Sequence, residues 1–176
     1  MNCYSLTKML PINLTNLSEG VYAYMYANCD KLEGPITLGS DSERLTIGVS
    51  CCSNMFRNCN KIAQISIYCN SLQNASFENM FMNCRYLTTA TLDVKNTSNN
   101  KKYSLLRMFY NCIRLSTITY NCPEIFATDF TYEWLNNVVN SDGKFYHHTN
   151  ILKDRIKIWC HTTVPTGWEL TSIGEK

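Results

Sequence analysis

Ten cysteines and three histidines are the side chains of this chain that could hold a metal ion, form disulfides or act as nucleophiles. Five of the cysteines recur at intervals of 26, 30, 25 and 28 residues, and each directly follows an asparagine. Such recurrence beside apolar residues indicates a packing position in a repeat. No Cys-x-x-Cys spacing, which zinc sites commonly use, occurs in the sequence. The recurring cysteines are Cys3, Cys29, Cys59, Cys84 and Cys112.

We expect these five cysteines to be buried free thiols, with disulfides between stacked repeats and metal binding as the two alternatives. Cys51 and Cys52 are adjacent in a predicted loop, and we expect oxidation there before anywhere else. The dipeptides His147-His148 and Cys160-His161 could in principle supply four metal ligands. A strand end and a loop account for them more simply, so we expect neither a metal nor a cofactor.

Motifs that would indicate catalysis are missing from the sequence. It contains no Gly-x-Ser-x-Gly, His-Glu-x-x-His, phosphate-binding loop or dinucleotide fingerprint. A pair of acids suited to glycoside chemistry is not excluded by spacing alone, but no such pair falls on a repeat face. We therefore expect a protein that is not an enzyme and has no catalytic residues.

The elements that position the cysteines belong to a repeat of Met-aromatic-x-Asn-Cys-x-x-Leu. Four copies carry the Met-aromatic pair, and all five have Leu or Ile three residues after the cysteine. A period of this length is typical of a solenoid, in which each coil packs only against its neighbours. The repeat-core residues that we predict are Cys3, Leu6, Cys29, Leu32, Phe56, Cys59, Ile62, Phe81, Cys84, Leu87, Phe109, Cys112 and Leu115.

Within each coil the pattern predicts a turn, a short strand and one or two helical turns. The alternating apolar residues Ala90 and Leu92 indicate a strand, and β-branched Thr91 lies between them. A further short extended piece is predicted at 45–49. The Met-aromatic segments are too short for a free helix but long enough for one or two helical turns, which we expect on the side of the coil opposite the strand.

Residues 1–122 resemble the BspA-type (Treponema-type) leucine-rich repeat, whose pattern is aromatic-x-x-Cys-x-x-Leu-x-x-Ile-x-Leu. The resemblance implies an α/β fold, namely a right-handed leucine-rich-repeat solenoid with a parallel β-sheet and short helical turns, in about five coils. It also implies adhesion or protein recognition without catalytic residues.

Residues 123–176 are predicted to form a small α+β cap on the solenoid, because open solenoid ends expose core and strand edges. Asp129 is the expected N-cap of a helix whose apolar face holds Trp134, Leu135, Val138 and Val139. Strands are expected at 144–146 and 168–171. The segment resembles the tail of repeat proteins of gut Bacteroidales and their phages. The cap residues that carry this resemblance are Trp134, Phe145, Tyr146, Pro165, Gly167 and Trp168.

Composition narrows the function further. A net charge of +2 without a basic stripe gives no support for nucleic-acid binding, and no apolar run is long enough to cross a membrane. Eleven tyrosines could supply a sugar- or protein-binding platform, and Tyr68 and Tyr120 are expected at strand ends, near the surface.

Three functional hypotheses remain. The first is a bacteriophage virion protein, such as a tail-fibre, tail-tip or capsid-associated protein. The alternatives are the C-terminal part of a bacterial cell-surface adhesin and an intracellular interaction scaffold. The expected location is the virion, with the cell surface as the alternative. The expected partners are other virion or surface proteins, a host-surface protein or glycan, or a second copy of the chain.

Overall fold

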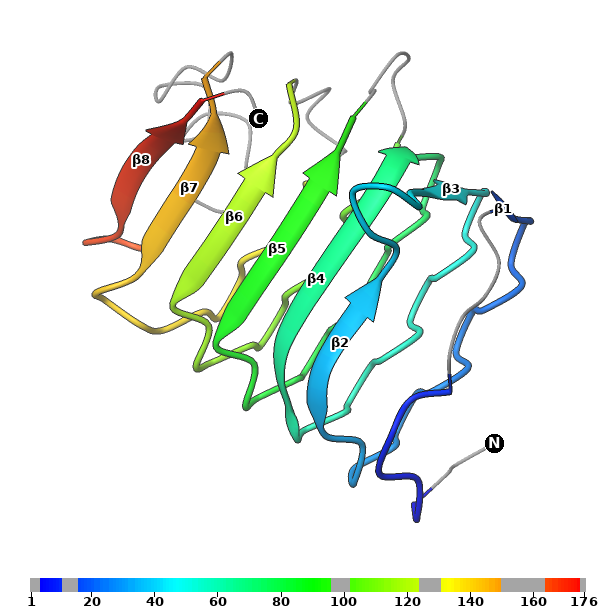
Figure 1. Cartoon of the computed structure of the whole chain (residues 1–176). Helices are drawn as coiled ribbons and strands as arrows, with labels where there is room; N and C mark the ends of the chain where they lie inside the picture. The colour runs from blue at the N-terminus through cyan, green and yellow to red at the C-terminus, as the bar shows by residue number, and fades with distance from the viewer. Residues whose placement is uncertain (1–3, 11–15, 96–101, 124–130, 150–163, 175–176) are drawn as a thin grey trace.

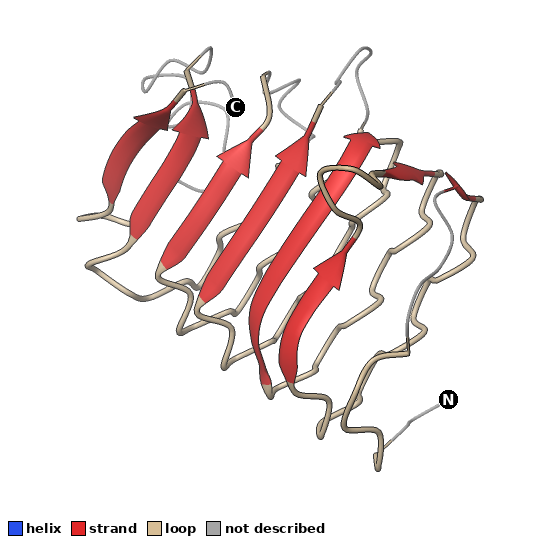
Figure 2. Ribbon diagram, in the orientation of Figure 1, coloured by secondary structure: helices blue, strands red, loops and turns tan. Residues whose placement is uncertain are grey.

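The computed structural model describes residues 4–10, 16–95, 102–123, 131–149 and 164–174. In this part of the chain it is an all-β parallel solenoid, with one long sheet on one side and a stack of turns on the other (Figures 1 and 2). The expected parallel strands are present, but the expected α/β leucine-rich-repeat fold with helical turns is wrong, because no helix occurs among the described residues. In the same described residues, no helix long and apolar enough to cross a membrane is found.

Eight described strands form the sheet in the order β1-β3-β4-β5-β6-β7-β8, and β2 also pairs with β4. All pairings are parallel. The long strand β4 pairs with β2 through its first half and with β3 through its last residues. The strands are β1 Asn16–Leu17, β2 Gly34–Leu38, β3 Leu45–Ile47, β4 Ile62–Ser71, β5 Thr89–Val94, β6 Thr117–Asn121, β7 Lys144–His148 and β8 Glu169–Ile173.

The period-two apolar pattern decides which face of each strand is buried. One inward row runs across the sheet as Ile65, Ala90, Ile118, Phe145 and Leu170, each beside the next in register. The side chains between these positions point away from the core, because successive residues of a strand face opposite sides. The predicted strands at 90–92, 144–146 and 168–171 are confirmed, and β3 confirms the short extended piece.

Overlapping β-turns occupy the places where helical turns were predicted. In the ribbon around Phe56, alternate amides donate within the coil, as from Met55 to the Cys52 carbonyl at 3.1 Å. The amides between them donate to the next coil, as from Phe56 to the Met80 carbonyl at 2.9 Å. A helix would satisfy all of these amides internally and leave the coils without backbone bonds to each other. Stacking therefore overrides the helical propensity of these segments.

Positive φ angles at every fourth residue make this ribbon incompatible with a helix. Asn54 and Asn58 have φ of 56° and 63°, and the next coil repeats this at Asn79 and Asn83. Asparagine tolerates the left-handed region better than other side chains. This explains why the recurring motif contains asparagine immediately before the cysteine.

The core of the solenoid contains a column of stacked aromatic rings. Tyr26 stacks on Phe56 with ring centroids 5.4 Å apart, and Phe56 stacks on Phe81 at 5.3 Å. The column continues to Phe109 at 6.1 Å, and Trp134 follows it at 6.3 Å in a tilted arrangement. Side chains at equivalent positions of successive coils therefore contact each other, as expected for a solenoid.

The predicted repeat-core residues that the structure describes are buried, except for Leu6, which is partly buried against the core. Cys3 lies outside the described residues. The buried members are Cys29, Leu32, Phe56, Cys59, Ile62, Phe81, Cys84, Leu87, Phe109, Cys112 and Leu115.

Residues 131–138 repeat the turn ribbon and do not form the predicted helix. Glu133 and Asn137 have φ of 52° and 60°, and the Phe109 amide donates to the Trp134 carbonyl at 2.9 Å. Trp134 and Val138 are buried, but Val139 is 72% exposed, so the predicted apolar face is only partly right. The expected N-cap, Asp129, lies outside the described residues.

The predicted cap residues fall into different environments. Trp134 and Phe145 are buried in the core, and Trp168 is nearly so. Trp168 packs against Gly143, where a Cβ atom would lie only 2.1 Å from the indole, and its Nε1 donates to the Asn140 carbonyl at 2.6 Å. The other three are not buried: Tyr146 and Pro165 are half-buried, and Gly167 is exposed.

Candidate ligand-binding site on the sheet face

The outward face of the sheet carries polar and aromatic side chains in two adjacent rows. Tyr68, Asp93 and Asn121 are neighbours in register across β4, β5 and β6. Two residues earlier on the strands, Thr91 on β5 pairs with Thr119 on β6, which pairs with Tyr146 on β7. Because these positions alternate with the buried rows, they lie on the open side of the sheet.

A loop between β2 and β3 brings charged residues onto this face. The loop leaves the sheet at Gly39, whose φ of 73° suits glycine, and whose missing side chain leaves room for the Tyr68 carbonyl. It presents Asp41 and Arg44, and the Arg44 guanidinium lies over the Tyr68 ring at 5.8 Å from the centroid. An interruption of the repeat therefore supplies two of the charged side chains of the site, Asp41 and Arg44.

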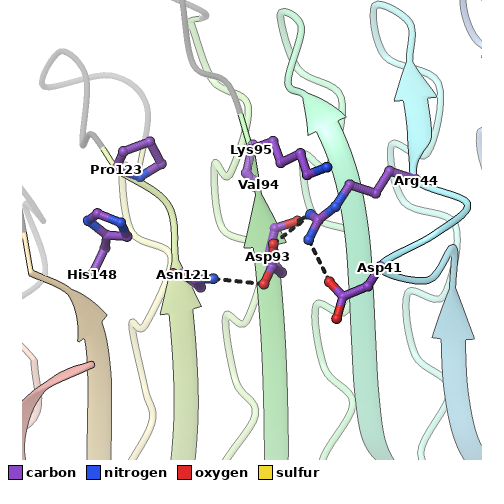
Figure 3. A pocket seen from close by; sticks show the side chains of 8 residues that line it. All are labelled: Asp41, Arg44, Asp93, Val94, Lys95, Asn121, Pro123 and His148. Atoms are coloured by element: carbon purple, nitrogen blue, oxygen red, sulfur yellow. Dashed lines mark hydrogen bonds and ion pairs between the residues drawn. The ribbon is translucent and has the colours of Figure 1, made fainter. Parts of the chain in front are cut away.

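Arg44 of the loop, Asp93 of β5 and Asn121 of β6 form a hydrogen-bonded chain (Figure 3). Arg44 donates to Asp93 Oδ1 at 2.5 Å and to Asp41 Oδ1 at 2.7 Å. Asn121 Nδ2 donates to Asp93 Oδ2 at 2.8 Å. The side chains of Arg44 and Asp93 are only 7% and 11% exposed, whereas that of Asp41 is 67% exposed. Asp93 is thus held in place from both sides.

The electrostatics of this chain favour a charged Arg44. Burial alone would lower the pKa of the guanidinium, but hydrogen bonds and charge attraction from Asp93 and Asp41 outweigh burial and raise that pKa. The lining also includes Lys95, so two cationic and two anionic side chains meet here. The site is polar without a strong excess of either sign.

Two adjoining hollows share Asp93 and Asn121. One, of about 570 Å³, extends toward Lys95, Pro123 and His148. The other, of about 320 Å³, extends from Tyr68 over Thr91, Thr119 and Tyr146 to Ile173 and Gly174. Both volumes lie in the range of small-ligand sites. Together they form what we call the face trough, defined by the described residues that line it: Asp41, Arg44, Tyr68, Thr91, Asp93, Val94, Lys95, Thr119, Asn121, Pro123, Tyr146, His148, Ile173 and Gly174.

Two polar atoms of the face trough have no hydrogen-bond partner among the described residues. They are Asn121 Oδ1, an acceptor, and Arg44 Nε, a donor. Both atoms are almost fully covered by protein atoms, so a ligand could reach them only if these side chains moved. The lining groups that a bound molecule can reach are the hydroxyls of Thr91 and Thr119, which donate and accept, and the exposed Asp41 carboxylate, which accepts.

Sequence reasoning identified only part of this site. Tyr68 lies on the open face as expected, although inside β4 and not at a strand end. Tyr120 is fully buried and packs edge-on against Trp134 at 5.7 Å. Arg44 and Asp93 were missed, although an acid directly after the inward Leu92 was a signal for an outward charge. Their partnership spans 49 residues and has no local signature.

The cysteines form a separate set on the inside of the coils. Cys59 donates its thiol to the Tyr26 carbonyl at 3.0 Å, and Cys84 and Cys112 donate likewise to the preceding coil at 3.1 Å. Burial raises the pKa of the Cys59 thiol to about 12. These thiols are hydrogen-bond donors in the core and lie on the opposite side of the sheet from the trough.

The vicinal pair Cys51 and Cys52 is buried, with the two sulfurs 3.8 Å apart. The hydrogen bond from the Cys52 thiol lowers the pKa of Cys51 to about 7, and the same bond raises that of Cys52. His147 is buried and its ring Nδ1 lies 3.0 Å from the His148 carbonyl. Cys160 and His161 lie outside the described residues. Within the described ranges, no three His, Cys, Asp or Glu side chains are grouped to hold a metal ion.

Comparisons with protein-family models, curated proteins and solved structures find no match for this chain. The face trough is therefore interpreted from its own geometry.

Proposed function

We propose that this chain is a non-enzymatic recognition module that holds an extended polar ligand on the open face of its sheet. The observation that carries the proposal is the face trough: two adjoining hollows that share Asp93 and Asn121 and cross the outward side of several strands. A solenoid face suits such binding because each coil adds one more row of side chains to a continuous surface.

The chemistry of the trough favours binding over catalysis. Its two carboxylates, Asp41 and Asp93, both bond to the single guanidinium of Arg44. This arrangement orders the side chains but differs from a nucleophile hydrogen-bonded to a base. Recognition requires donors and acceptors held in position, which the chain from Arg44 to Asn121 provides.

The biological setting that we propose is a bacteriophage particle, with a bacterial cell-surface adhesin as the alternative. Support comes from the sequence resemblances alone: the BspA-type pattern, which implies adhesion or protein recognition, and the C-terminal pattern around Trp134 and Trp168. Either setting would use the module to contact a protein or a glycan.

A direct test compares a substitution inside the trough with one outside it. Thr119→Arg places a long charged side chain in the trough, whereas Ile113→Arg places the same side chain at an exposed position before β6. Labelled wild-type protein and both variants are applied to arrays of glycans and of surface proteins to measure binding. The masses of bound ligands are then determined by mass spectrometry after incubation, to detect any chemical change. We expect Thr119→Arg to lose binding and Ile113→Arg to keep it, with ligand masses unchanged. Equal binding by all three proteins, or a changed ligand mass, would contradict the proposal.

A further inference from the structure

We infer that the ligand of the face trough is an uncharged oligosaccharide, bound by stacking on Tyr146 and Tyr68 and by hydrogen bonds to Asn121 and Asp93. This inference rests on the proposed recognition function and names its ligand class. It follows from three features of the trough: its charge balance, its unused hydrogen-bonding capacity and its two tyrosines.

Charge balance argues against an anionic ligand such as a phosphate or a sulfated sugar. Such ligands need cationic groups that are free to bind them. Both terminal nitrogens of Arg44 are already bonded, Nη1 to Asp93 and Nη2 to Asp41. The remaining cation of the lining, Lys95, faces a trough with two carboxylates. A neutral ligand meets no electrostatic penalty here.

The hydrogen-bonding groups of the trough match hydroxyls. Each carboxylate oxygen of Asp93 retains acceptor capacity beyond the bond it makes, and the Asn121 side chain beside it lines both hollows. Thr91 and Thr119 carry hydroxyls that both donate and accept. A sugar presents several adjacent hydroxyls that do the same, so the trough and a sugar complement each other.

Two tyrosines line the smaller hollow, which continues past Tyr146 to Ile173 and Gly174. Tyr68 on β4 and Tyr146 on β7 are separated by the strands that carry Thr91 and Thr119, a distance of about 14 Å across the sheet. Tyrosine offers an apolar ring for the C–H face of a pyranose and a hydroxyl for its polar edge. The spacing suits a short oligosaccharide better than a single ring.

A peptide fits this face less well. Extended peptides commonly add to the edge of a sheet, where backbone groups are free. Here the strands β5 and β6 are paired on both sides, so their backbone groups are already used. Recognition must come from side chains, which favours a ligand rich in hydroxyls.

The inference is tested by nuclear magnetic resonance on the full chain labelled with ¹⁵N. The probes are cellotriose, xylotriose, mannotriose and lactose, with sialyllactose as the charged counterpart of lactose and a serine-rich hexapeptide as the peptide probe. We expect at least one neutral saccharide to shift the amides of Thr91, Asp93, Asn121 and Tyr146, with a Kd of about 1 mM or tighter. Sialyllactose should bind no better than lactose.

Variants establish that the shifts report the trough. Tyr146→Ala and Asn121→Ala should each weaken binding by about tenfold. Tyr146→Phe keeps the ring and should retain most of the binding. Tyr86→Ala removes an exposed tyrosine outside the trough and should leave binding unchanged. Melting curves of each variant show that it is folded.

Two results separate the inference from the proposed function. If only sialyllactose or the peptide shifts the trough amides, or if neutral saccharides bind equally to the Tyr146→Ala and Asn121→Ala variants, the saccharide inference is wrong while recognition stands. If no probe shifts these amides and no array ligand depends on Thr119, both the inference and the proposed function fail.

Discussion

Asn58 donates its side-chain amide to Asn28 Oδ1 at 2.6 Å, although the two residues are thirty positions apart in the chain. Both residues have φ near +60°, a left-handed conformation that asparagine tolerates. Asparagine at this position therefore suits the backbone of the turn and also links two coils through its side chain. The same bond recurs from Asn83 to Asn58 at 2.7 Å, from Asn111 to Asn83 at 2.9 Å, and from Asn137 to Asn111 at 2.9 Å. This asparagine ladder holds the turn ribbons in register.

We predict that Asn83→Ala lowers the free energy of unfolding by about 2–3 kcal/mol. The substitution removes two hydrogen bonds, and alanine tolerates the φ of 64° at this position less well than asparagine does. Asn83→Gly loses the same bonds but accepts the backbone conformation, so it should cost less. Urea unfolding of the two variants checks this. An alanine variant as stable as the glycine variant would show that the positive φ is not a constraint.

We predict that Leu87→Asp unfolds the central coils. Leu87 is fully buried next to the cysteine column, and an unpaired charge there should cost several kcal/mol. Arg85→Asp introduces the same side chain two residues earlier at an exposed position and should change stability by about 0.5 kcal/mol or less. Thermal melting followed by circular dichroism measures both. Equal melting temperatures would mean that this turn is placed incorrectly.

We predict that the protein loses stability in alkali because of its core thiols. Burial raises the pKa of Cys59 from 9.0 to about 12, and burial likewise raises the pKa of Cys69, Cys84 and Cys112. Above pH 9 the unfolded chain therefore releases protons that the folded chain keeps. The stability that these thiols contribute is complete below pH 9 and falls as the pH rises toward 12, by about 1.4 kcal/mol per pH unit for each thiol.

The measurement is the urea midpoint of unfolding as a function of pH in this window. Cys84→Ala removes one of the titrating groups and should make the fall shallower by about 1.4 kcal/mol per pH unit. Identical slopes for the wild type and this variant would contradict the assignment of the effect to buried thiols.

We predict that the two acidic partners of Arg44 contribute unequally to stability. Asp93→Asn removes a charge that is 11% exposed and leaves the buried guanidinium with only its solvent-exposed partner, at a cost of about 2–3 kcal/mol. Asp41→Asn removes a charge that is 67% exposed, so screening by water should limit the cost to about 1 kcal/mol or less. Chemical denaturation of the two isosteric variants compares them directly. A larger loss from Asp41→Asn would reverse our view of which carboxylate anchors the loop.

The strands and the inward columns could be predicted from the sequence, because the alternation of apolar residues reports burial position by position. Ala90 and Leu92, for example, are buried on the inward face as the pattern predicted. The recurring asparagine was also visible, but its meaning was not, since a single coil does not show that its side chain meets the same residue of the next coil.

Only the tertiary structure decided between helical turns and the turn ribbon, because that choice depends on backbone bonds between coils, such as the one from Phe56 to Met80. It also decided the face trough. Arg44 comes from an interruption of the repeat and Asp93 from a regular strand, and no local pattern relates the two. Their contact follows from the register with which β3, β4 and β5 stack, which is fixed by the packing of whole coils. The repeat therefore determined the solenoid and its inside, while the stacking of unequal coils determined the chemistry of its outer face.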